Sequence, residues 1–402
     1  MGRRILLTGL DTFWGGRVAA ALEQDDDVEM LLGMGTGHPS IELERTEYVR
    51  ADNSYSLLSR LVRATGVDTI VHTFLVLDSS SMSGRALHET NVIGTMNLLA
   101  AAGASDSSVR QIVVKSSSLV YGSHPADPTW FKEDTPRSRA PRNRVERSLC
   151  EVESYVHDFA VDNPGVAVSM LRFANVLGAD IDTPISRNLA RGIMPSIAGF
   201  DPLIQFVEED DVVRCVEFLV KSGLRGVFNV AGDGKLPVSE VASIAGARRL
   251  HLPPFFTAHA AAPFVRARLL SFPNELEDLL RYGRGIDTTA IKEAGFTPST
   301  TAAGAVERFA QSNRLRRTVG DQLPHYKYEA DIEAFFKHSP AVVRPVGGHA
   351  GHTNAGSSGD RATGHDAPAG VTRRARTRAA AQNPRGPSGS EDRPNVGGPL
   401  SH

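Results

Sequence analysis

Short apolar runs alternate with longer amphipathic stretches along the first 175 residues of the chain. Five of the apolar runs have the length and composition of buried strands, namely residues 5–9, 28–34, 69–75, 111–117 and 166–173. Four stretches between them carry apolar residues at helical spacing, namely residues 18–24, 54–65, 86–103 and 144–160. Strands that alternate regularly with helices are typical of βαβ units, which build a parallel sheet covered by helices. The pattern therefore predicts an α/β fold with a doubly wound parallel sheet.

The pattern becomes less regular after Asn175. Three later segments indicate a strand that turns into a helix, a further strand and a final helix, namely residues 204–223, 226–232 and 301–312. We interpret residues 1–175 as a dinucleotide-binding domain. Residues 176–315 are then the remaining sheet elements and a smaller C-terminal lobe on the substrate side.

The last part of the chain differs in composition from the rest. Residues 346–402 contain 11 glycines and no aromatic residue, so they lack the apolar side chains that a packed core requires. We predict a disordered low-complexity tail over these residues and a helical extension over residues 316–345.

The overall composition is that of an ordinary globular protein, with 41% hydrophobic residues, 22% charged residues and a formal net charge of −2. A nucleic-acid-binding domain would carry a basic excess, so nucleic acid is not expected as a partner. The two cysteines, Cys150 and Cys215, lack the spacing of a zinc site, so we expect no metal and a reducing, cytoplasmic location. The first apolar stretch is too short for a secretory signal or a membrane span, and no membrane association is expected.

The segment TGLDTFWGG, residues 8–16, ends the first predicted strand and opens the first predicted helix. Dinucleotide-binding folds hold the pyrophosphate at this turn, where backbone N–H groups and the positive end of a helix face the phosphates. Glycine lets the backbone approach the phosphates closely, but Thr12 stands where one of the usual three glycines lies. The candidate cofactor-binding residues of this loop are Gly9, Asp11, Thr12, Phe13, Trp14 and Gly15.

Further segments follow this motif in a consistent order, namely ADNSYS (51–56), ETNVIGTMNLL (89–99), KSSSLVYGS (115–123), LRFANVLG (171–178), FVEEDDV (206–212) and FNVAGDG (228–234). With these segments the chain resembles the NAD-dependent epimerase/dehydratase family of extended short-chain dehydrogenases/reductases, typified by UDP-glucose 4-epimerase. The resemblance covers about residues 3–310. It implies a Rossmann-type sheet, NAD as cofactor, a nucleotide-sugar-like substrate, and a homodimer formed through residues 144–160 and the helix before them.

The resemblance also implies cofactor-binding residues outside the glycine loop. Asp52 and Asn53 occupy the place of an acidic residue that bonds the adenine, and Asn91 matches an asparagine beside the nicotinamide half. Phe74 is a further candidate cofactor-binding residue. The structural alternatives are a helix cap for Asp52 and a backbone-bonded helix position for Asn91.

The choice between NAD and NADP normally depends on an acidic or basic residue at the end of the second strand. This chain has Gly33, Met34 and Gly35 there. The family favours NAD, and NADP stays open.

The expected catalytic centre departs from the family. Ser117 stands at the family's serine, which hydrogen-bonds the reacting sugar hydroxyl, and Ser118 is assigned to substrate binding. The family also requires a tyrosine followed four residues later by a lysine, so that a phenolate of lowered pKa accepts the hydroxyl proton. Residues 122–154 contain no tyrosine.

Matching Pro141 and Glu151 to the residues that bracket that pair places Asn143 at the tyrosine position and Arg147 at the lysine position. An asparagine cannot exchange a proton near neutral pH, whereas an arginine can still hold ribose hydroxyls. We therefore predict Ser117, Asn143 and Arg147 as an atypical catalytic set.

Five further polar residues have expected roles. Asn175 matches an asparagine that contacts the phosphate-sugar part of the substrate, with loop capping as the alternative. Tyr121 is expected to be a packing residue and Glu146 to lie on a solvated helix face, while Asp210 and Asp211 are expected to cap a helix.

Two functions follow from these residues. The first is an enzyme that binds NAD(P) and acts on a nucleotide-sugar-like substrate through a non-standard proton relay that involves Ser117. The alternative is a catalytically impaired NAD(P)-binding protein with a sensing or regulatory role. The sequence alone does not identify the sugar.

Overall fold

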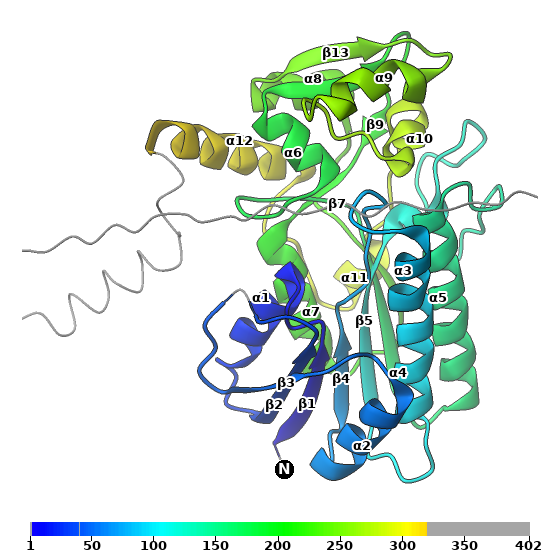
Figure 1. Ribbon diagram of the computed structural model, residues 1–402, viewed down its shortest axis with the longest axis vertical. Coiled ribbons are helices and arrows are strands. Elements are labelled where there is room, and N and C mark those ends of the chain that lie inside the picture. Colours follow the sequence, from blue (N-terminus) through cyan, green and yellow to red (C-terminus); the bar gives the residue numbers. More distant parts are fainter. Residues whose placement is uncertain (1, 40, 320–402) are drawn as a thin grey trace, which may run out of the picture. The chain divides into compact units, whose positions relative to one another are not determined.

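The computed structural model describes residues 2–39 and 41–319 of the chain. A parallel sheet of seven strands forms its centre, in the order β11-β6-β5-β4-β1-β2-β3 (Figure 1). The strands are β1 (Arg3–Thr8), β2 (Val28–Gly35), β3 (Thr46–Arg50), β4 (Thr69–His72), β5 (Gln111–Ser117), β6 (Ala167–Phe173) and β11 (Gly226–Val230). The predicted α/β fold with a doubly wound parallel sheet is confirmed, and β3 is a strand that the apolar pattern did not reveal.

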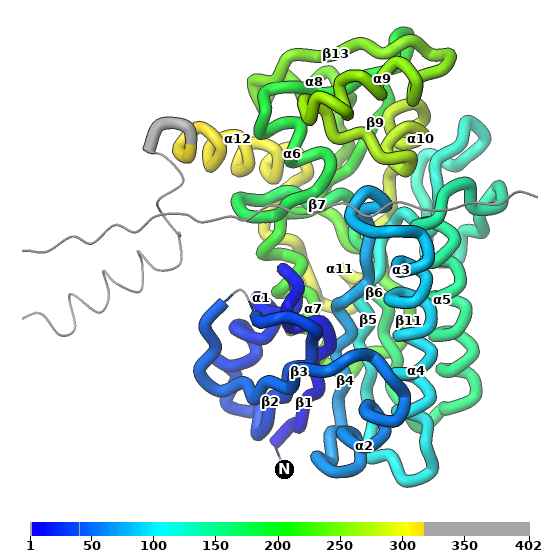
Figure 2. The backbone as a smooth tube through the Cα atoms, in the orientation of Figure 1, coloured from blue at the N-terminus to red at the C-terminus, as the bar shows by residue number. Residues whose placement is uncertain are grey.

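Helices cover both faces of this sheet (Figure 2). One layer contains α1 (Phe13–Leu22), α7 (Glu209–Ser222) and α11 (Thr289–Glu293). The other contains α2 (Tyr55–Thr65), α3 (Gly84–His88), the π-helical turn η1 (Glu89–Ile93), α4 (Gly94–Ala102) and α5 (Arg144–Asp162). The predicted helix over residues 86–103 is thus built from three consecutive helical segments.

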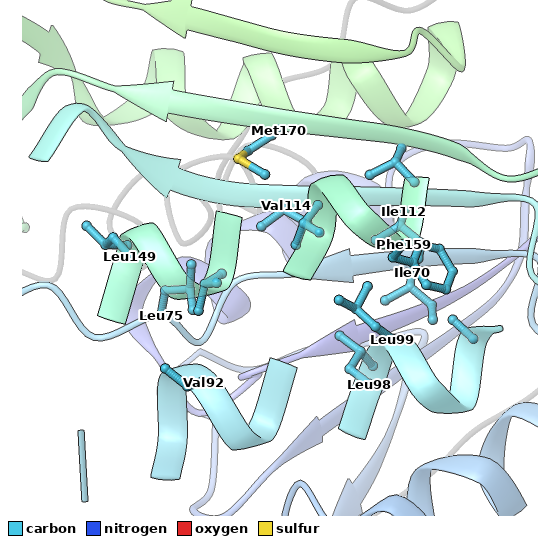
Figure 3. Packing of buried hydrophobic residues seen from close by; sticks show 14 of the residues in the cluster. Ile70, Leu75, Val92, Leu98, Leu99, Ile112, Val114, Leu149, Phe159 and Met170 are labelled. Atoms are coloured by element: carbon cyan, nitrogen blue, oxygen red, sulfur yellow. The ribbon is translucent and has the colours of Figure 1, made fainter. Parts of the chain in front are cut away.

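The strand β5 lies near the middle of the sheet and is buried along its whole length. Because successive side chains of a strand point to opposite faces, Ile112 and Val114 pack against α4 and α5, while Val113 packs in the α1/α7 layer. Figure 3 shows Ile112 and Val114 in this cluster together with Leu149 of α5. Burial of each such apolar side chain stabilises the folded protein by about 1.5–3 kcal/mol.

The remaining elements form a smaller lobe with its own apolar core. It contains three two-stranded sheets and five helices, namely β7 (Asn175–Leu177) with β10 (Phe206–Glu208), β9 (Leu203–Ile204) with β12 (Leu236–Pro237), β8 (Ile193–Ile197) with β13 (Arg248–Leu252), and α6 (Pro184–Ala190), α8 (Val238–Ala245), α9 (Thr257–Arg266), α10 (Asn274–Tyr282) and α12 (Ala302–Val319). Between these elements the chain returns to the central sheet for α7 and β11. Within the described residues, no helix is both long and apolar enough to cross a membrane.

Two predictions concern the end of the chain. The predicted helical extension over residues 316–345 lies outside the described residues, apart from the last residues of α12. The predicted disordered tail over residues 346–402 lies outside them entirely.

A buried ion pair joins α5 to β6. The Arg172 guanidinium donates to the Glu153 carboxylate at 2.6–3.2 Å, and the Ser116 hydroxyl donates to the same carboxylate at 2.6 Å. Arg172 also donates to the Tyr121 hydroxyl, whose ring stacks on Phe131 at 4.6 Å between centroids. Tyr121 is therefore held as a packing residue, as expected, and burial raises the pKa of its hydroxyl.

We expect Glu153→Ala to lower the free energy of unfolding by about 3–5 kcal/mol, because it leaves the Arg172 charge buried without a counter-ion. Guanidinium unfolding of the purified protein measures this loss. The control is Glu89→Ala in the exposed Arg85–Glu89 pair, for which a change below about 0.5 kcal/mol is expected. Equal losses in the two variants would contradict the prediction.

Candidate functional site

A cavity of about 330 Å³ lies at the carboxyl edge of the sheet, where the small lobe covers it. Its wall combines the first residues of α1, the loop after β4, the end of β5, the start of β7, and parts of the 180–185 segment and α10. In open parallel sheets, ligands bind at this edge, outside the carboxyl ends of the strands. A larger cleft of about 590 Å³ beside α5, β6 and β11 contains none of the predicted site residues.

The glycine loop has the close contacts that the sequence predicts. Gly9 has a φ of +77°, and a Cβ there would lie 2.7 Å from the Phe74 Cβ atom. A Cβ on Gly15 would lie 2.0 Å from the Gly9 carbonyl oxygen. Any larger residue would therefore push the turn apart.

Thr12 acts as the N-cap of α1. Its hydroxyl donates to the Gly9 carbonyl at 2.6 Å and accepts from the Gly15 amide at 3.1 Å. The amides of Phe13 and Trp14 at the first turn have no partner among the described residues. The loop therefore presents free donors at the positive end of a helix, although its middle glycine is replaced.

Asp11 reaches from the same loop to the end of β2. One oxygen of its carboxylate accepts from the Thr36 amide at 3.0 Å, the Thr36 hydroxyl at 2.9 Å and the Gly37 amide at 2.7 Å. A Cβ on Gly35 would lie 2.4 Å from the other carboxylate oxygen. Asp11 thus places a carboxylate where the strand itself carries no acidic residue.

Three further predicted cofactor-binding residues lie in the loops after β3 and β4, namely Asp52, Asn53 and Phe74. A Cβ on Gly94 would lie 3.1 Å from the Phe74 ring and 3.2 Å from the Asn53 amide nitrogen, which brings those two side chains together. Asp52 is exposed and accepts from the Ser54 amide at 3.2 Å. Its carboxylate is therefore free on its solvent side.

Asn91 is fully buried, and its side chain is bonded by the protein itself. The amide accepts from the Val76 N–H at 2.8 Å and donates to the Val76 carbonyl at 2.9 Å and to the Ser148 hydroxyl at 3.2 Å. Val76 lines the cavity. Asn91 therefore positions the cavity wall rather than facing the cavity.

The end of β5 supplies two polar side chains to the cavity, Lys115 and Ser117. The Ser117 hydroxyl accepts from the Leu119 amide at 3.2 Å, which leaves its proton available for a second partner. Ser118 is buried and is not part of the cavity wall.

Lys115 is a site residue that the sequence analysis did not identify. Its side chain is 3% exposed, and its Nζ lies 4.6 Å from the centroid of the Trp14 ring and 5.8 Å from that of Phe173. Within the described residues it has neither a hydrogen bond nor an ion pair. Burial lowers the pKa of this amine to about 7. The available signal was a lone lysine inside the apolar run QIVVKSS.

The structure does not bring Asn143 and Arg147 to the cavity. Asn143 caps α5, and its side chain exchanges hydrogen bonds with Glu146 at 2.8 and 2.9 Å. Arg147 is exposed, and its guanidinium has no hydrogen bond or ion pair among the described residues. Val145 and Leu149 have the same spacing of four residues on α5, and they face the core, where both are fully buried. The inner face of α5 is therefore apolar at this level.

The expectation that Glu146 lies on a solvated helix face is wrong. Its side chain is buried, and its carboxylate accepts from the Arg137 guanidinium at 2.6 Å. The ion pair compensates for the loss of hydration. Because Asn143 and Arg137 occupy this carboxylate, we assign it no role in proton transfer.

Asn175 lines the cavity and donates to the Gln205 carbonyl at 2.9 Å. The expectation that Asp210 and Asp211 cap a helix is wrong, because the carboxylate of Glu208 caps α7 by accepting from the Asp210 amide at 2.8 Å. Asp211 is instead buried and accepts from the Ser299 amide.

The lobe is fastened to the loop after β4 by polar contacts at the cavity rim. The Glu275 carboxylate of α10 accepts from the amide and the hydroxyl of Ser79 at 2.9 and 2.7 Å. The Arg187 guanidinium of α6 pairs with Asp78. Asp78 and Glu275 are both part of the cavity wall that Lys115 and Ser117 share.

Comparison with known proteins adds independent information. The sequence model described as the NAD dependent epimerase/dehydratase family matches residues 5–231. An uncharacterized protein of Mycobacterium tuberculosis is 34% identical over 319 residues, which cover 77% of this chain and 84% of that protein. A UDP-glucose 4-epimerase of Halalkalibacterium halodurans is 25% identical over 274 residues, which cover 60% and 78%.

Solved structures share the fold. A UDP-glucose 4-epimerase from Thermotoga maritima, solved with UDP-glucose, has a TM-score of 0.61 at 18% identity and covers 79% of this chain and 99% of its own. A dTDP-glucose 4,6-dehydratase from Streptomyces venezuelae, solved with NAD, has a TM-score of 0.60 at 22% identity and covers 79% and 99%.

We expect Lys115→Met to change how stability depends on pH. The pKa of the folded lysine is about 7 against an ordinary 10.5, so between these values the unfolded chain binds a proton that the folded chain does not. This lysine therefore makes wild-type stability rise with pH in that window, by at most about 1.4 kcal/mol per pH unit.

Unfolding at pH 7.5, 8.5 and 9.5 tests this expectation. Lys115→Met should be more stable than the wild type by a margin that shrinks as pH rises. The exposed Lys132→Met is the control and should leave the wild-type slope unchanged. A margin that does not vary with pH would refute a lowered pKa.

Proposed function

Because the chain belongs to the NAD dependent epimerase/dehydratase family, we propose that it is an enzyme that binds NAD along the glycine loop and acts on a nucleotide-sugar-like substrate beside Ser117. The observation that carries this proposal is a shared cavity. Trp14 of the glycine loop, Ser117 of β5 and Asn175 of β7 line one space, and the small lobe covers it. A cofactor and a substrate that meet there would be shielded from water.

The residues of the loop fit a dinucleotide. The free amides of Phe13 and Trp14 would bind the pyrophosphate, and Gly9 and Gly15 keep the turn narrow. Phe74 and Asn53 would flank the adenine half. When bound, the nicotinamide supplies a hydride acceptor. The chain itself orients the substrate hydroxyl through Ser117.

The named relatives support this substrate class. A relative of this chain carries the name UDP-glucose 4-epimerase, as does one solved structure with the same fold, and another structure with this fold was solved with UDP-glucose and NAD together. The proton relay that we propose starts at Ser117 and does not include Asn143 or Arg147, because neither lines the cavity.

The alternative function is an NAD(P)-binding protein without turnover, with a sensing or regulatory role. The observation in its favour is the inner face of α5, where Val145 and Leu149 are apolar and Asn143 is used entirely as a cap. The two functions differ in turnover and not in cofactor binding.

Asp11 supports NAD over NADP. Its second carboxylate oxygen accepts no hydrogen bond from the described residues and lies at the end of β2. A carboxylate in this place accepts hydrogen bonds from the adenosine ribose hydroxyls, and its charge repels a 2′-phosphate.

A homodimer through α4 and α5 is also proposed. Met96 of α4 and Tyr155 of α5 are 38% and 40% exposed, and they line a shallow groove between the two helices. Large apolar side chains grouped on a surface are typical of protein interfaces.

We expect the purified protein with NAD to convert at least one UDP- or dTDP-linked hexose, and Ser117→Ala to lower kcat by about 10- to 100-fold, because one hydrogen bond to a developing charge is lost. Product analysis by chromatography measures the rate. The exposed Ser154→Ala is the control and should retain the wild-type rate. NADH binding without turnover of any sugar in a broad panel would favour the sensing function.

We expect Asp11→Asn to tighten NADPH binding at least about 10-fold and to change NADH binding by less than about threefold, because it removes a charge that repels the 2′-phosphate. Quenching of tryptophan emission reports binding, since Trp14 lies in the loop. Asp26→Asn makes the same charge change before β2, at the opposite edge of the sheet, and should change neither affinity. A wild type that binds both cofactors equally would overturn the selectivity.

A further inference from the structure

Lys115 and Ser117 are on the same face of β5. They are two residues apart, so their Cα atoms are separated by roughly 6.6 Å along the strand. Ser116 between them points to the opposite face, where its hydroxyl donates to Glu153 of α5. Two functional groups of β5 therefore share the cavity that the lobe covers.

No anion within the described residues neutralises Lys115. Four carboxylates line the cavity, and all have other partners: Asp78 and Asp182 pair with Arg187, Asp180 pairs with Arg316, and Glu275 accepts from Ser79. Among the described residues, the rings of Trp14 and Phe173 have their centroids 4.6 and 5.8 Å from Lys115 Nζ, which has neither a hydrogen bond nor an ion pair.

An apolar surrounding favours the uncharged form of an amine. Desolvation is the sole cause of the lowered pKa of Lys115, which is about 7. At physiological pH, a substantial fraction of the protein molecules therefore carries Lys115 as a neutral amine. A neutral amine has a lone pair and accepts a proton, which an ordinary surface lysine does not do near pH 7.

We propose that Lys115 is a catalytic residue, whose neutral ε-amine accepts the proton of the substrate hydroxyl that Ser117 orients. The inference rests on the proposed function, since it requires a substrate carbinol and an oxidised nicotinamide cofactor in the cavity. The O–H and C–H bonds of the carbinol break. The proton passes to Lys115 Nζ, the hydride with its electron pair passes to the nicotinamide, and the carbinol becomes a carbonyl while the amine becomes an ammonium.

A different role would be a permanent cation that holds a phosphate group. Lys115→Arg separates the two roles, because a guanidinium keeps the charge but does not accept a proton. If Lys115 acts as a base, both Lys115→Arg and Lys115→Met remove its function. If it acts as a cation, only Lys115→Met does.

The first experiment measures single-turnover reduction of NAD by the substrate found for the wild type. Lys115→Met and Lys115→Arg should both be slowed at least about 100-fold, the low end of a general-base contribution. NADH affinity should stay within threefold, and the exposed Lys132→Met should match the wild type. In Lys115→Ala, added ethylamine should restore part of the rate. A Lys115→Arg variant with the wild-type rate would overturn the proposal.

The second experiment does not depend on turnover. The full chain is labelled with ¹³C at the lysine ε-carbons, and each ε-carbon resonance is titrated with pH. One resonance should titrate near pH 7 and be missing from Lys115→Met. If the resonance that Lys115→Met removes titrates above pH 9, Lys115 is charged at neutral pH and the proposal is overturned.

The two experiments distinguish the inference from the function on which it rests. A wild type that binds NADH, converts no sugar and still has the amine titrating near pH 7 overturns the proposed enzyme and with it the proton transfer. A wild type that converts a sugar at a rate unaffected by Lys115→Met overturns the role of Lys115 alone.

Discussion

Side chains of β5 alternate between its two faces, and the neighbouring elements depend on this alternation. Ser116 points to α5 and joins the buried pair of Glu153 and Arg172. Lys115 and Ser117 point the other way, to the edge where α1 begins and the lobe closes. The strand β5 therefore holds α5 on one face of the sheet and supplies Lys115 and Ser117 to the cavity on the other.

The buried pair and the cavity use opposite ways of placing a charge inside a protein. The Glu153 carboxylate accepts hydrogen bonds from Arg172 and Ser116, so opposite charges lie side by side where little water reaches them. Lys115 has neither a hydrogen bond nor an ion pair among the described residues, and burial lowers the pKa of its amine to about 7, which favours the neutral form. The first arrangement serves stability, and the second produces a group that exchanges protons near neutral pH.

Residues 122–154 contain no tyrosine, so the tyrosine that the family resemblance implies near the start of α5 is absent. The inner face of α5 carries Val145 and Leu149 in the apolar core, and Figure 3 shows Leu149 among its neighbours there. The inner face of α5 is apolar at this level, while the ionisable Lys115 lies on β5 and points to the other face of the sheet. The proton transfer that we propose therefore uses a residue of a strand, Lys115.

The sequence by itself determined the central fold, because βαβ alternation and the glycine loop are local patterns that chain neighbours create. Short motifs also predicted Gly9, Gly15 and Ser117 as site residues, and the structure places Ser117 on the cavity wall. From the sequence, Glu146 was expected in solvent and Asn143 and Arg147 were expected at the site. Which face of α5 packs against the sheet depends on contacts with other elements, so the sequence of the helix did not reveal it. Only the tertiary structure decided that Lys115 is buried without a counter-ion and that Asp11 serves the end of β2. Both facts arise from residues far apart in the chain, whose distances and shared burial are fixed only when the strands, α1 and the lobe pack together.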